Sequence, residues 1–469
     1  MRAHLALLMT WLVPALAIGA VPPKVSQTLA AEHLPASAES FVILDPENGH
    51  IIDSALPDEA RSPASTIKTL TTFAALDMLG PAFVWHTQAY AHGRLEDGVL
   101  DGDLVLQGGG DPYMTLERWW SFVHELRAKG LRTINGDIVI DDAAFALPPE
   151  DPGAFDGKPN RPYNVVPDAL MVNFQSIDFR LAANAAARAV DIDATPAPPN
   201  LIIENHVRYV PGRCRLSSAR VDFKVASENW DRVVFSGALS PSCAERSFTR
   251  VLLTPASYAY GTFVELWRQQ GGVFKGRLKI SNTPTDAKLL VNFDSLSLGE
   301  IIRLTNKYSS NLMARHLLLT LGAERFGVPA TLDKGAQVIE AWGKERGFDL
   351  AGINIDNGSG LSRATHISVL QLARVLCAAY RSPFAPEFMA SLPLAGLDGT
   401  LKSRMRGVAA GSVRLKTGHI DGVSGVAGFV TADSGKTYVL VSLVNHPRAD
   451  YGAGEPVHAA LVSFIQNDL

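Results

Sequence analysis

The sequence predicts a multidomain α/β protein in which an antiparallel sheet covered by helices is split by a large β-rich insertion. Amphipathic helical patterns lie near the ends of the chain, at 65–79, 298–306, 312–321 and 367–379. Between them, short strand-like runs alternate with Gly, Pro and Asp. We therefore expect a split helix-covered domain, residues 21–85 and 291–469, and a β-rich insertion of two subdomains at 86–290.

The strands of the split domain are expected at both of its ends. Apolar runs at 41–45 and 50–52 flank Asn48 and Gly49, a strong hairpin signal. Two further strand patterns, 426–431 and 437–444, precede a last helix at about 455–466. We expect these terminal strands to pair with the N-terminal hairpin.

Residues 1–20 have the pattern of a secretory signal peptide. Arg2 and His4 precede an apolar stretch at 5–17, and small residues follow at the cleavage positions. A membrane anchor is the alternative, but the apolar run is too short to span a bilayer comfortably. The mature protein is therefore expected in the periplasm or another extracytoplasmic compartment, with at most peripheral membrane association.

The composition excludes one class of partner. The chain has 469 residues and a formal charge of −4, and no basic stripe is visible, which argues against nucleic acid. No Cys/His spacing is typical of a zinc site, so neither a metal nor a cofactor is expected.

Export permits a disulfide, which we predict between Cys214 and Cys243. Cys377 lies in an apolar helical pattern and is expected to be a buried free thiol.

The first candidate catalytic element is Ser65-Thr66-Ile67-Lys68, where a Ser and a Lys are three residues apart at a helix start. Positions i and i+3 share a helix face, so the amine can approach the hydroxyl. A Ser hydroxyl needs a base to take its proton, and a neutral Lys can be that base if burial or another cation lowers its pKa. A Ser and a Lys on a solvated helix face are the alternative.

The second element is Ser-x-Asn, which occurs twice. Ser309-Ser310-Asn311 falls in the break between two predicted helices, and Ser227-Glu228-Asn229 falls in the insertion. At a helix–helix turn the hydroxyl can pass a proton to a leaving group and the Asn can hold a substrate carbonyl. We interpret the first copy as functional and the second as a surface turn.

The third element is Lys416-Thr417-Gly418, which follows an apolar run and is expected on an edge strand. An edge strand can pair with a peptide substrate through its backbone. Gly418 permits close approach of that substrate. Lys416 and Thr417 can bind a terminal carboxylate, and Lys416 can also lower the pKa of Lys68.

Together these elements carry a resemblance to a known group. Ser-x-x-Lys, Ser-x-Asn and Lys-Thr-Gly, in this order, form the signature of β-lactamases and penicillin-binding proteins. The chain resembles the class C low-molecular-mass penicillin-binding proteins, the D-alanyl-D-alanine carboxypeptidase/endopeptidases of penicillin-binding protein 4 type. The blocks that carry the resemblance are R-S-P-A-S-T-I-K-T-L-T-T at 61–72, G-D-L-V-L-Q-G-G-G-D-P at 102–112, G-D-I-V-I-D-D at 136–142, D-N-G-S-G-L-S-R at 356–363 and L-A-G-L-D-G-T-L at 394–401.

The resemblance implies a β-lactamase/transpeptidase-like fold and a role for each matching residue. Peptidoglycan stem peptides are the implied substrates and β-lactam antibiotics the implied covalent inhibitors. The implied roles are Ser65 as the nucleophile, Lys68 as the base, Ser309 as the proton shuttle, Asn311 as a ligand of the substrate amide, Lys416 and Thr417 as ligands of the carboxylate, the backbone N–H groups of Ser65 and His419 as the oxyanion hole, and Asp141 and Arg363 as ligands of a diaminopimelate side chain.

Two departures and two alternatives remain. His419 stands where a small hydroxyl residue is usual, and Asp421 stands where a neutral amide can occur. A serine β-lactamase would share the three elements, but no Glu-x-x-x-Asn lies between Asn311 and Lys416 to support hydrolysis of its acyl-enzyme. A non-catalytic cell-wall-binding protein with the same fold is the other alternative. The sequence does not fix the balance between carboxypeptidase and endopeptidase action.

Overall fold

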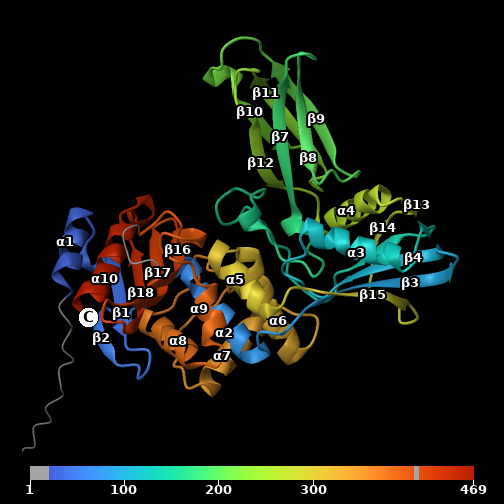
Figure 1. Ribbon diagram of the computed structural model, residues 1–469. Helices are drawn as coiled ribbons and strands as arrows, with labels where there is room; N and C mark the ends of the chain where they lie inside the picture. The colour runs from blue at the N-terminus through green and yellow to red at the C-terminus, as the bar shows by residue number, and fades with distance from the viewer. Residues whose placement is uncertain (1–20, 406–410) are drawn as a thin grey trace, which may run out of the picture.

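The computed structural model describes residues 21–405 and 411–469 (Figure 1). The predicted signal peptide lies outside the described residues. Within them, no helix has the length and apolar character needed to cross a membrane. The helix-covered sheet and the strand-rich insertion lie beside one another, and the second part of the insertion extends away from both.

The first sheet has five strands, in the order β16-β17-β18-β1-β2. Their bounds are β1 Glu39–Leu44, β2 Ile51–Ala55, β16 Val413–Ile420, β17 Val423–Thr431 and β18 Thr437–Asn445. Strand β1 pairs antiparallel with β18 and with β2. The predicted pairing of the terminal strands with the N-terminal hairpin is therefore confirmed, and β16 lies at an edge.

Both faces of this sheet are covered because its strands are apolar on both sides. Along β1, Phe41 and Ile43 enter one core and Val42 and Leu44 the other, as the two-residue period of a strand requires. The first core packs against α1 (Pro23–Ala31) and α10 (Gly454–Asp468). The second packs against α2 (Lys68–Leu79), α5 (Leu298–Tyr308), α6 (Asn311–Phe326), α7 (Leu332–Glu345), α8 (Val369–Arg381) and α9 (Ala385–Ser391).

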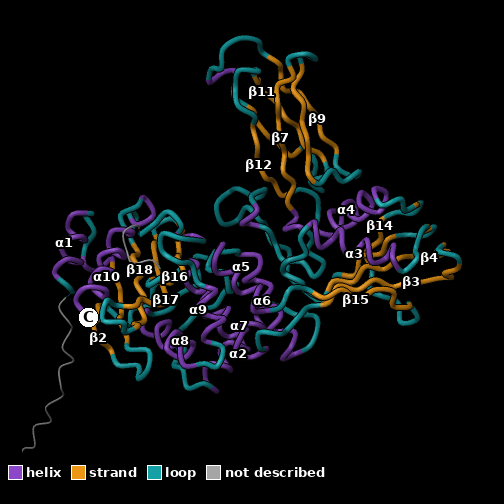
Figure 2. Tube along the Cα trace, in the orientation of Figure 1, coloured by secondary structure: helices purple, strands orange, loops and turns teal. Residues whose placement is uncertain are grey.

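The insertion begins with a seven-stranded sheet. It contains β3 (His86–Glu96), β4 (Val99–Gly108), β5 (Thr133–Ile134), β6 (Ile138–Asp141), β13 (Val273–Phe274), β14 (Leu278–Ile280) and β15 (Lys288–Asp294). Two helices that the sequence analysis did not predict, α3 (Leu116–Ala128) and α4 (Pro255–Gln269), belong to the same core. Figure 2 shows these helices beside the strands.

Two three-stranded sheets form the extended part of the insertion. One contains β7 (Ser176–Asn184), β8 (Ala189–Thr195) and β12 (Arg246–Val251), and the other β9 (Ile202–Tyr209), β10 (Val221–Val225) and β11 (Arg232–Leu239). The rings of Phe179 and Phe235 join them, with centroids 5.0 Å apart. Cys214 and Cys243 form a disulfide, and Cys377 is a buried free thiol, so both cysteine predictions agree with the structure.

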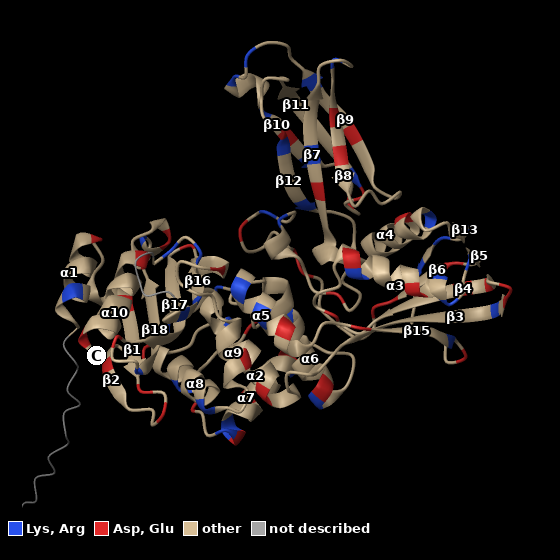
Figure 3. Cartoon of the chain, viewed as in Figure 1, with Lys and Arg blue, Asp and Glu red and all other residues tan. Residues whose placement is uncertain are grey.

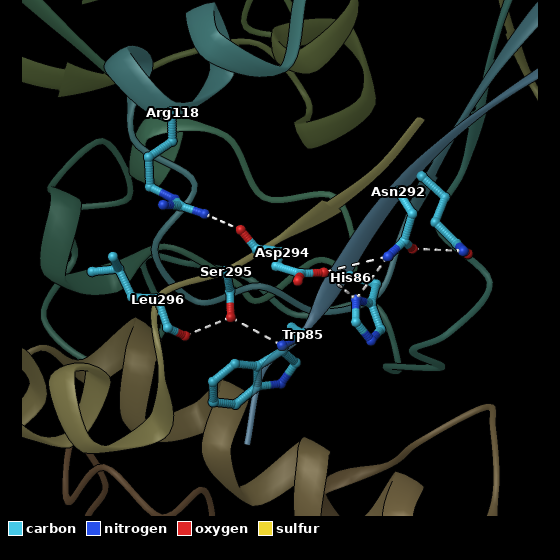
Figure 4. A network of polar contacts seen from close by, with 8 residues as sticks. Trp85, His86, Arg118, Asn292, Asp294, Ser295 and Leu296 are labelled. Carbon is cyan, nitrogen blue, oxygen red and sulfur yellow. Dashed lines mark hydrogen bonds and ion pairs between the residues drawn. The ribbon is translucent and has the colours of Figure 1, made fainter. Parts of the chain in front are cut away.

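The chain crosses between the two parts at the ends of β3 and β15, where polar groups fix the crossing (Figure 4). Nδ1 of His86 lies 2.8 Å from a carboxylate oxygen of Asp294. Oγ of Ser295 accepts from the backbone N–H of Trp85 at 2.9 Å. The guanidinium of Arg118 donates to the carbonyl of Asp294. In the cartoon of Figure 3, Lys and Arg positions and Asp and Glu positions are interspersed along the ribbon.

A buried polar chain lies between the sheet and α10. Oγ of Ser442 donates to Glu39 at 2.7 Å and lies 2.6 Å from Nδ1 of His458, whose Nε2 lies 3.0 Å from Oγ of Ser424. Burial raises the pKa of Glu39 to about 8, although Ser442 and Arg61 oppose the shift. Burial also lowers the pKa of His458 to about 3. Both groups are therefore neutral in the folded protein at pH 7.

The raised pKa of Glu39 predicts a pH-dependent stability. The Glu39 carboxyl loses its proton near pH 4.5 in the unfolded chain and near pH 8 in the folded chain. The contribution of Glu39 to the free energy of unfolding is therefore complete below pH 4.5 and is lost as the pH rises to about 8. Glu39→Gln removes the titration. The Tm of the wild type should fall relative to that of E39Q between pH 5 and pH 8.5, as measured by calorimetry. A constant difference across this range would contradict the assignment.

Candidate active site

Ser65 lies in a short turn ahead of α2. The sequence pattern predicted a helix from Ser65, but a 3-10 turn spans Ala64–Ile67 and the α-helix begins at Lys68. Pro63, whose ring restricts its own φ, precedes this turn, and Ala64 begins it with a positive φ of 44°. In a 3-10 turn residues i and i+3 eclipse each other, which still brings Nζ of Lys68 to 2.8 Å from Oγ of Ser65.

The environment of Lys68 favours a neutral amine. Its side chain is fully buried, and burial, followed by the charge of Lys416, holds its pKa well below the usual value. Nζ lies 2.8 Å from Oδ1 of Asn311 and 2.5 Å from the carbonyl oxygen of Ser359, both of which are acceptors. A neutral amine has two N–H bonds and one lone pair. In that neutral form the two acceptors would use the N–H bonds, and the lone pair would face Oγ of Ser65, the third group within hydrogen-bond distance of Nζ.

The turn between α5 and α6 carries Ser309 and Asn311. Ser309 ends α5 in the left-handed conformation at φ 57°, and Ser310 caps α6 by accepting from the N–H of Met313. Asn311 is the first residue of α6, and its Nδ2 donates to the carbonyl of Tyr163 in the insertion at 3.0 Å. The turn therefore contacts both Lys68 and the insertion.

Lys416 joins this turn to the edge strand β16. Its fully buried Nζ donates to Oγ of Ser309 at 2.8 Å and to the carbonyl of Thr417 at 2.6 Å. Burial, with a smaller contribution from Arg404, lowers its pKa to about 7. Oγ1 of Thr417 donates to Oγ1 of Thr400 at 2.8 Å.

Gly418 brings β16 against the turn that carries Ser65. A Cβ at Gly418 would lie 2.6 Å from the carbonyl oxygen of Pro63 and 3.1 Å from the backbone nitrogen of Ser65. No side chain fits there without moving one of the two segments. His419 follows Gly418 in β16, so its backbone N–H is one residue away from this close contact, and its side chain is exposed.

A cavity of about 330 Å³ opens beside Asn311 and Ser359, and its lining includes Arg363, Phe155 and Tyr163. Arg363 lies with its guanidinium 4.8 Å from the ring centroid of Phe155. It also donates to the carbonyl of Asp421 at 2.9 Å and to its carboxylate at 3.1 Å. Asp421, singled out above as a departure, is thus a partner of Arg363.

The structure does not bring Asp141 to this cavity. Its carboxylate accepts from Gln107 at 2.8 Å, from the N–H and hydroxyl of Thr283 at 2.8 and 2.6 Å, and from the N–H of Ala143 at 3.1 Å. Burial raises the pKa of Asp141, but the hydrogen bonds, led by that of Thr283, outweigh it and the net shift is downward. Asp141 lines a different cavity together with Gln107 and Thr283.

The second Ser-x-Asn copy forms a turn, as expected. Oγ of Ser227 accepts from the N–H groups of Asp231 and Arg232, each at 3.0 Å. It lies in the insertion, between β10 and β11.

Three contributors to the site were missed in the sequence analysis. The carbonyls of Ser359 and Tyr163 act through the main chain, which carries no residue-type signal. Thr400 acts through its side chain and lies in the L-A-G-L-D-G-T-L block, which contributed to the resemblance but was given no role. Within the described residues, no group of three or more His, Cys, Asp or Glu side chains is arranged to hold a metal ion.

The sequence matches a family model and several known proteins. The family model described as the D-Ala-D-Ala carboxypeptidase 3 (S13) family matches residues 22–467. A D-alanyl-D-alanine carboxypeptidase of Actinomadura sp. (strain R39) is 29% identical over 430 residues, which cover 88% of this chain and 78% of that protein. The D-alanyl-D-alanine carboxypeptidase DacB of Haemophilus influenzae is 26% identical over 407 residues, 86% of this chain and 84% of that protein.

The fold has a solved counterpart. The crystal structure of penicillin-binding protein 4 from Haemophilus influenzae superposes with a TM-score of 0.79 at 23% identity, covering 94% of this chain and 99% of that one. The likeness extends over the helix-covered sheet and the insertion, since so little of either chain is left out. Because the family model also spans almost the whole described chain, the protein belongs to the D-Ala-D-Ala carboxypeptidase 3 (S13) family of hydrolases.

Proposed function

We propose that this chain cleaves the terminal D-alanyl bond of peptidoglycan stem peptides through an acyl-enzyme on Ser65. The observation that carries the proposal is the position of Nζ of Lys68, which lies 2.8 Å from Oγ of Ser65 and is also held by two acceptors, Asn311 Oδ1 and Ser359 O. This arrangement prepares the hydroxyl for deprotonation before a substrate arrives.

In the acylation step, the Ser65 proton moves to Nζ of Lys68 while Oγ attacks the carbonyl carbon of the penultimate D-Ala. The backbone N–H groups of Ser65 and His419 receive the developing oxyanion, an interaction worth about 10²–10³ in rate for a single donor. Ser309 then gives its proton to the departing amine nitrogen and regains one from Lys416, which already donates to its Oγ. The C–N bond breaks and D-Ala leaves.

In the deacylation step, a water molecule attacks the ester carbon and gives its proton through Ser309 to Lys416, which lost one during acylation. The protonated Lys68 returns its proton to Oγ of Ser65 as the ester bond breaks. The peptide leaves as a free acid and Ser65 regains its hydroxyl. The terminal carboxylate of the substrate is held by Lys416 and Thr417, which lie together at the edge of the sheet.

β-Lactam antibiotics are the proposed covalent inhibitors. Attack by Ser65 opens the lactam ring, so the amine cannot diffuse away and the ester persists. Related solved structures support this: one is penicillin-binding protein 4 of Haemophilus influenzae complexed with a β-lactam, and another is an endopeptidase of Bdellovibrio bacteriovorus acylated by penicillin G.

We also propose the finer assignments that follow from the sequence. The catalytic domain would comprise 21–85 and 291–469 and the insertion 86–290, which matches the separation of the cores. Arg363 would bind a carboxylate of the diaminopimelate side chain in the cavity that it lines. Asp141 could take part only after a rearrangement, because its present acceptor sites are occupied. An extracytoplasmic location follows from the substrate.

Mass analysis of purified muropeptides after incubation with the enzyme tests the proposal. Loss of terminal D-Ala would demonstrate carboxypeptidase action, and splitting of cross-linked dimers would demonstrate endopeptidase action. Neither product, with Ser65 intact and the protein folded, would overturn the proposal. Rapid turnover of nitrocefin, in place of stoichiometric acylation, would favour a β-lactamase instead.

A further inference from the structure

The insertion contains a cavity of about 320 Å³, which we call the insertion cavity. It is lined by residues within 147–152, 165–168, 228–230 and 251–255, together with Gln175. Two of the lining residues, Glu150 and Pro152, also line the cavity that contains Arg363. Arg315 of α6 holds this shared wall, because its guanidinium donates to both carboxylate oxygens of Glu150. The two cavities are therefore neighbours.

An apolar cluster joins the insertion cavity to the catalytic turn. Val165 and Val251, which line the cavity, belong to one buried cluster with Leu312 of α6. The ring of Trp230 packs against the same cluster. Leu312 directly follows Asn311, the residue that contacts Lys68. The insertion cavity is thus held in a fixed place beside the active site.

Trp230 gives the insertion cavity an aromatic surface. The residue has a left-handed backbone at φ 56° in the loop between β10 and β11. Its N–H donates to the carbonyl of Ser227 at 3.3 Å, and its carbonyl accepts from the N–H of Leu253 at 2.9 Å. The side chain is partly exposed and lines the cavity. A ring held in this way offers a flat apolar face to a ligand.

The polar groups of the insertion cavity are carboxyl and amide oxygens. Oδ1 of Asp168 accepts from the N–H of Leu170 at 2.9 Å, and Nε2 of Gln175 donates to the carbonyl of Leu253. Among the described residues, Oδ2 of Asp168 and Oε1 of Gln175 have no hydrogen-bond partner. The carboxylate of Glu228 is exposed. Such oxygens accept hydrogen bonds from hydroxyl groups and amide N–H groups.

The lining of the insertion cavity has no positive charge to offer. Within the described ranges 21–405 and 411–469, no Lys or Arg lines it, whereas Glu150 and Glu228 do. A carboxylate or a phosphate would lose its hydration there without gaining a cationic partner. A neutral ligand with an apolar face and several hydroxyl and amide groups fits this lining, and an N-acetylated amino sugar has all of these features.

The proposed substrate carries such a sugar. In a muropeptide, D-glutamate and L-alanine join the diaminopimelate to the lactyl group of N-acetylmuramic acid. The D-glutamate keeps a free carboxylate, which does not suit the insertion cavity. The lactyl carboxyl is part of an amide bond, so the sugar is neutral. A chain that leaves Arg363 and continues past the wall at Glu150 would bring this sugar to Trp230.

From these observations we infer that the insertion cavity is a saccharide subsite, which binds an amino sugar of the muropeptide against Trp230. The inference rests on the proposed function and deepens it, because it gives the insertion a part in substrate selection. The cavity volume lies within the range of about 300–1,000 Å³ found for small-ligand pockets.

The kinetic test compares release of D-Ala from a disaccharide-pentapeptide and from the same pentapeptide without sugar. For the wild type we expect kcat/KM to be at least about tenfold higher with the disaccharide. Trp230→Ala should remove this advantage and leave kcat/KM for the free pentapeptide within about twofold of the wild type. Trp230→Phe, which keeps an aromatic ring, should retain the advantage to within about threefold.

Trp120→Ala is the matched control, because Trp120 is an exposed Trp on α3 that lines neither cavity. It should show the wild-type preference. Tm reports on folding, and the rate of penicillin acylation reports on Ser65 with a ligand that has no sugar. Both should be unchanged in Trp230→Ala.

A binding test needs no turnover. The probe is the disaccharide of N-acetylglucosamine and N-acetylmuramic acid, with its lactyl carboxyl capped as a methylamide so that it is neutral. Isothermal titration should show binding to the wild type and at least about tenfold weaker binding to Trp230→Ala. No binding to the wild type, or equal binding to both proteins, would overturn the subsite.

The kinetic outcomes separate the two proposals. Equal kcat/KM of the wild type for the two substrates would overturn the subsite and leave the proposed release of D-Ala intact. An equal loss for both substrates in Trp230→Ala would also overturn the subsite, since it would assign Trp230 a structural role. A wild type that releases D-Ala from neither substrate would overturn the proposed function, and the titration would then decide the subsite alone.

Discussion

Replacing Lys68 by Met is expected to slow acylation of Ser65 by about 10²–10⁴-fold, the usual contribution of a general base. Met has a similar length and apolar stem but no lone pair that can accept the Ser65 proton. The rate constant for labelling by a fluorescent penicillin measures acylation directly, without the need for a natural substrate. A labelling rate within tenfold of the wild type would show that another group deprotonates Ser65.

Folding must be monitored in this variant, because Asn311 Oδ1 and Ser359 O lose their partner. The substitution also removes a buried amine, which is costly to desolvate, and this change favours the stability of the folded variant. Lys344→Met on the exposed face of α7 is the matched control, and it should label at the wild-type rate. If K68M keeps a cooperative thermal transition, its loss of labelling is chemical and not a consequence of unfolding.

Gly418→Ala should reduce kcat/KM for D-Ala release by at least about 10²-fold. The new methyl group would lie 2.6 Å from the carbonyl oxygen of Pro63, so β16 and the turn that carries Ser65 must separate. Separation displaces the N–H groups of Ser65 and His419 from one another, and misplacing one oxyanion donor costs about 10²–10³ in rate. Steady-state kinetics on a pentapeptide measures the effect.

Gly299→Ala is the control for this substitution. A Cβ at Gly299 meets only Pro81, at 3.6 Å, an ordinary contact distance, and the residue lies in the first turn of α5. We expect wild-type kinetics for G299A. Wild-type kinetics for G418A as well would mean that the close approach of β16 to Ser65 has no part in catalysis.

The strands and helices around the site were predictable because turn residues and the spacing of apolar residues determine them. Asn48 and Gly49 define the hairpin, and Gly49 has the positive φ of 74° that such a turn requires. The alternation of two cores along β1 explains why its sequence is continuously apolar. The start of α2 was predicted three residues early, because the positive φ of Ala64 depends on the packed loop around it and not on its residue type.

Contacts between segments far apart in the sequence were predictable only where they are made by side chains of a characteristic residue type. Functional side chains were proposed at Lys68, Asn311 and Lys416. The structure places Lys68 beside Asn311 and Lys416 beside Ser309. The carbonyl of Ser359 carries no such signal, although the Gly-rich block around it was recognised. The ligand role of Asp141 was implied by the resemblance alone and stays a prediction, and in this structure its carboxylate accepts hydrogen bonds from Gln107 and Thr283.

Peptide mass mapping after exposure to penicillin shows directly whether Ser65 forms the acyl-enzyme. Tryptic cleavage after Arg61 and Lys68 isolates Ser65 on the peptide 62–68. We expect one stoichiometric penicilloyl adduct on this peptide, and loss of both the adduct and D-Ala release in Ser65→Ala. An adduct on any other residue, or a Ser65→Ala protein that still labels and still releases D-Ala, would contradict it.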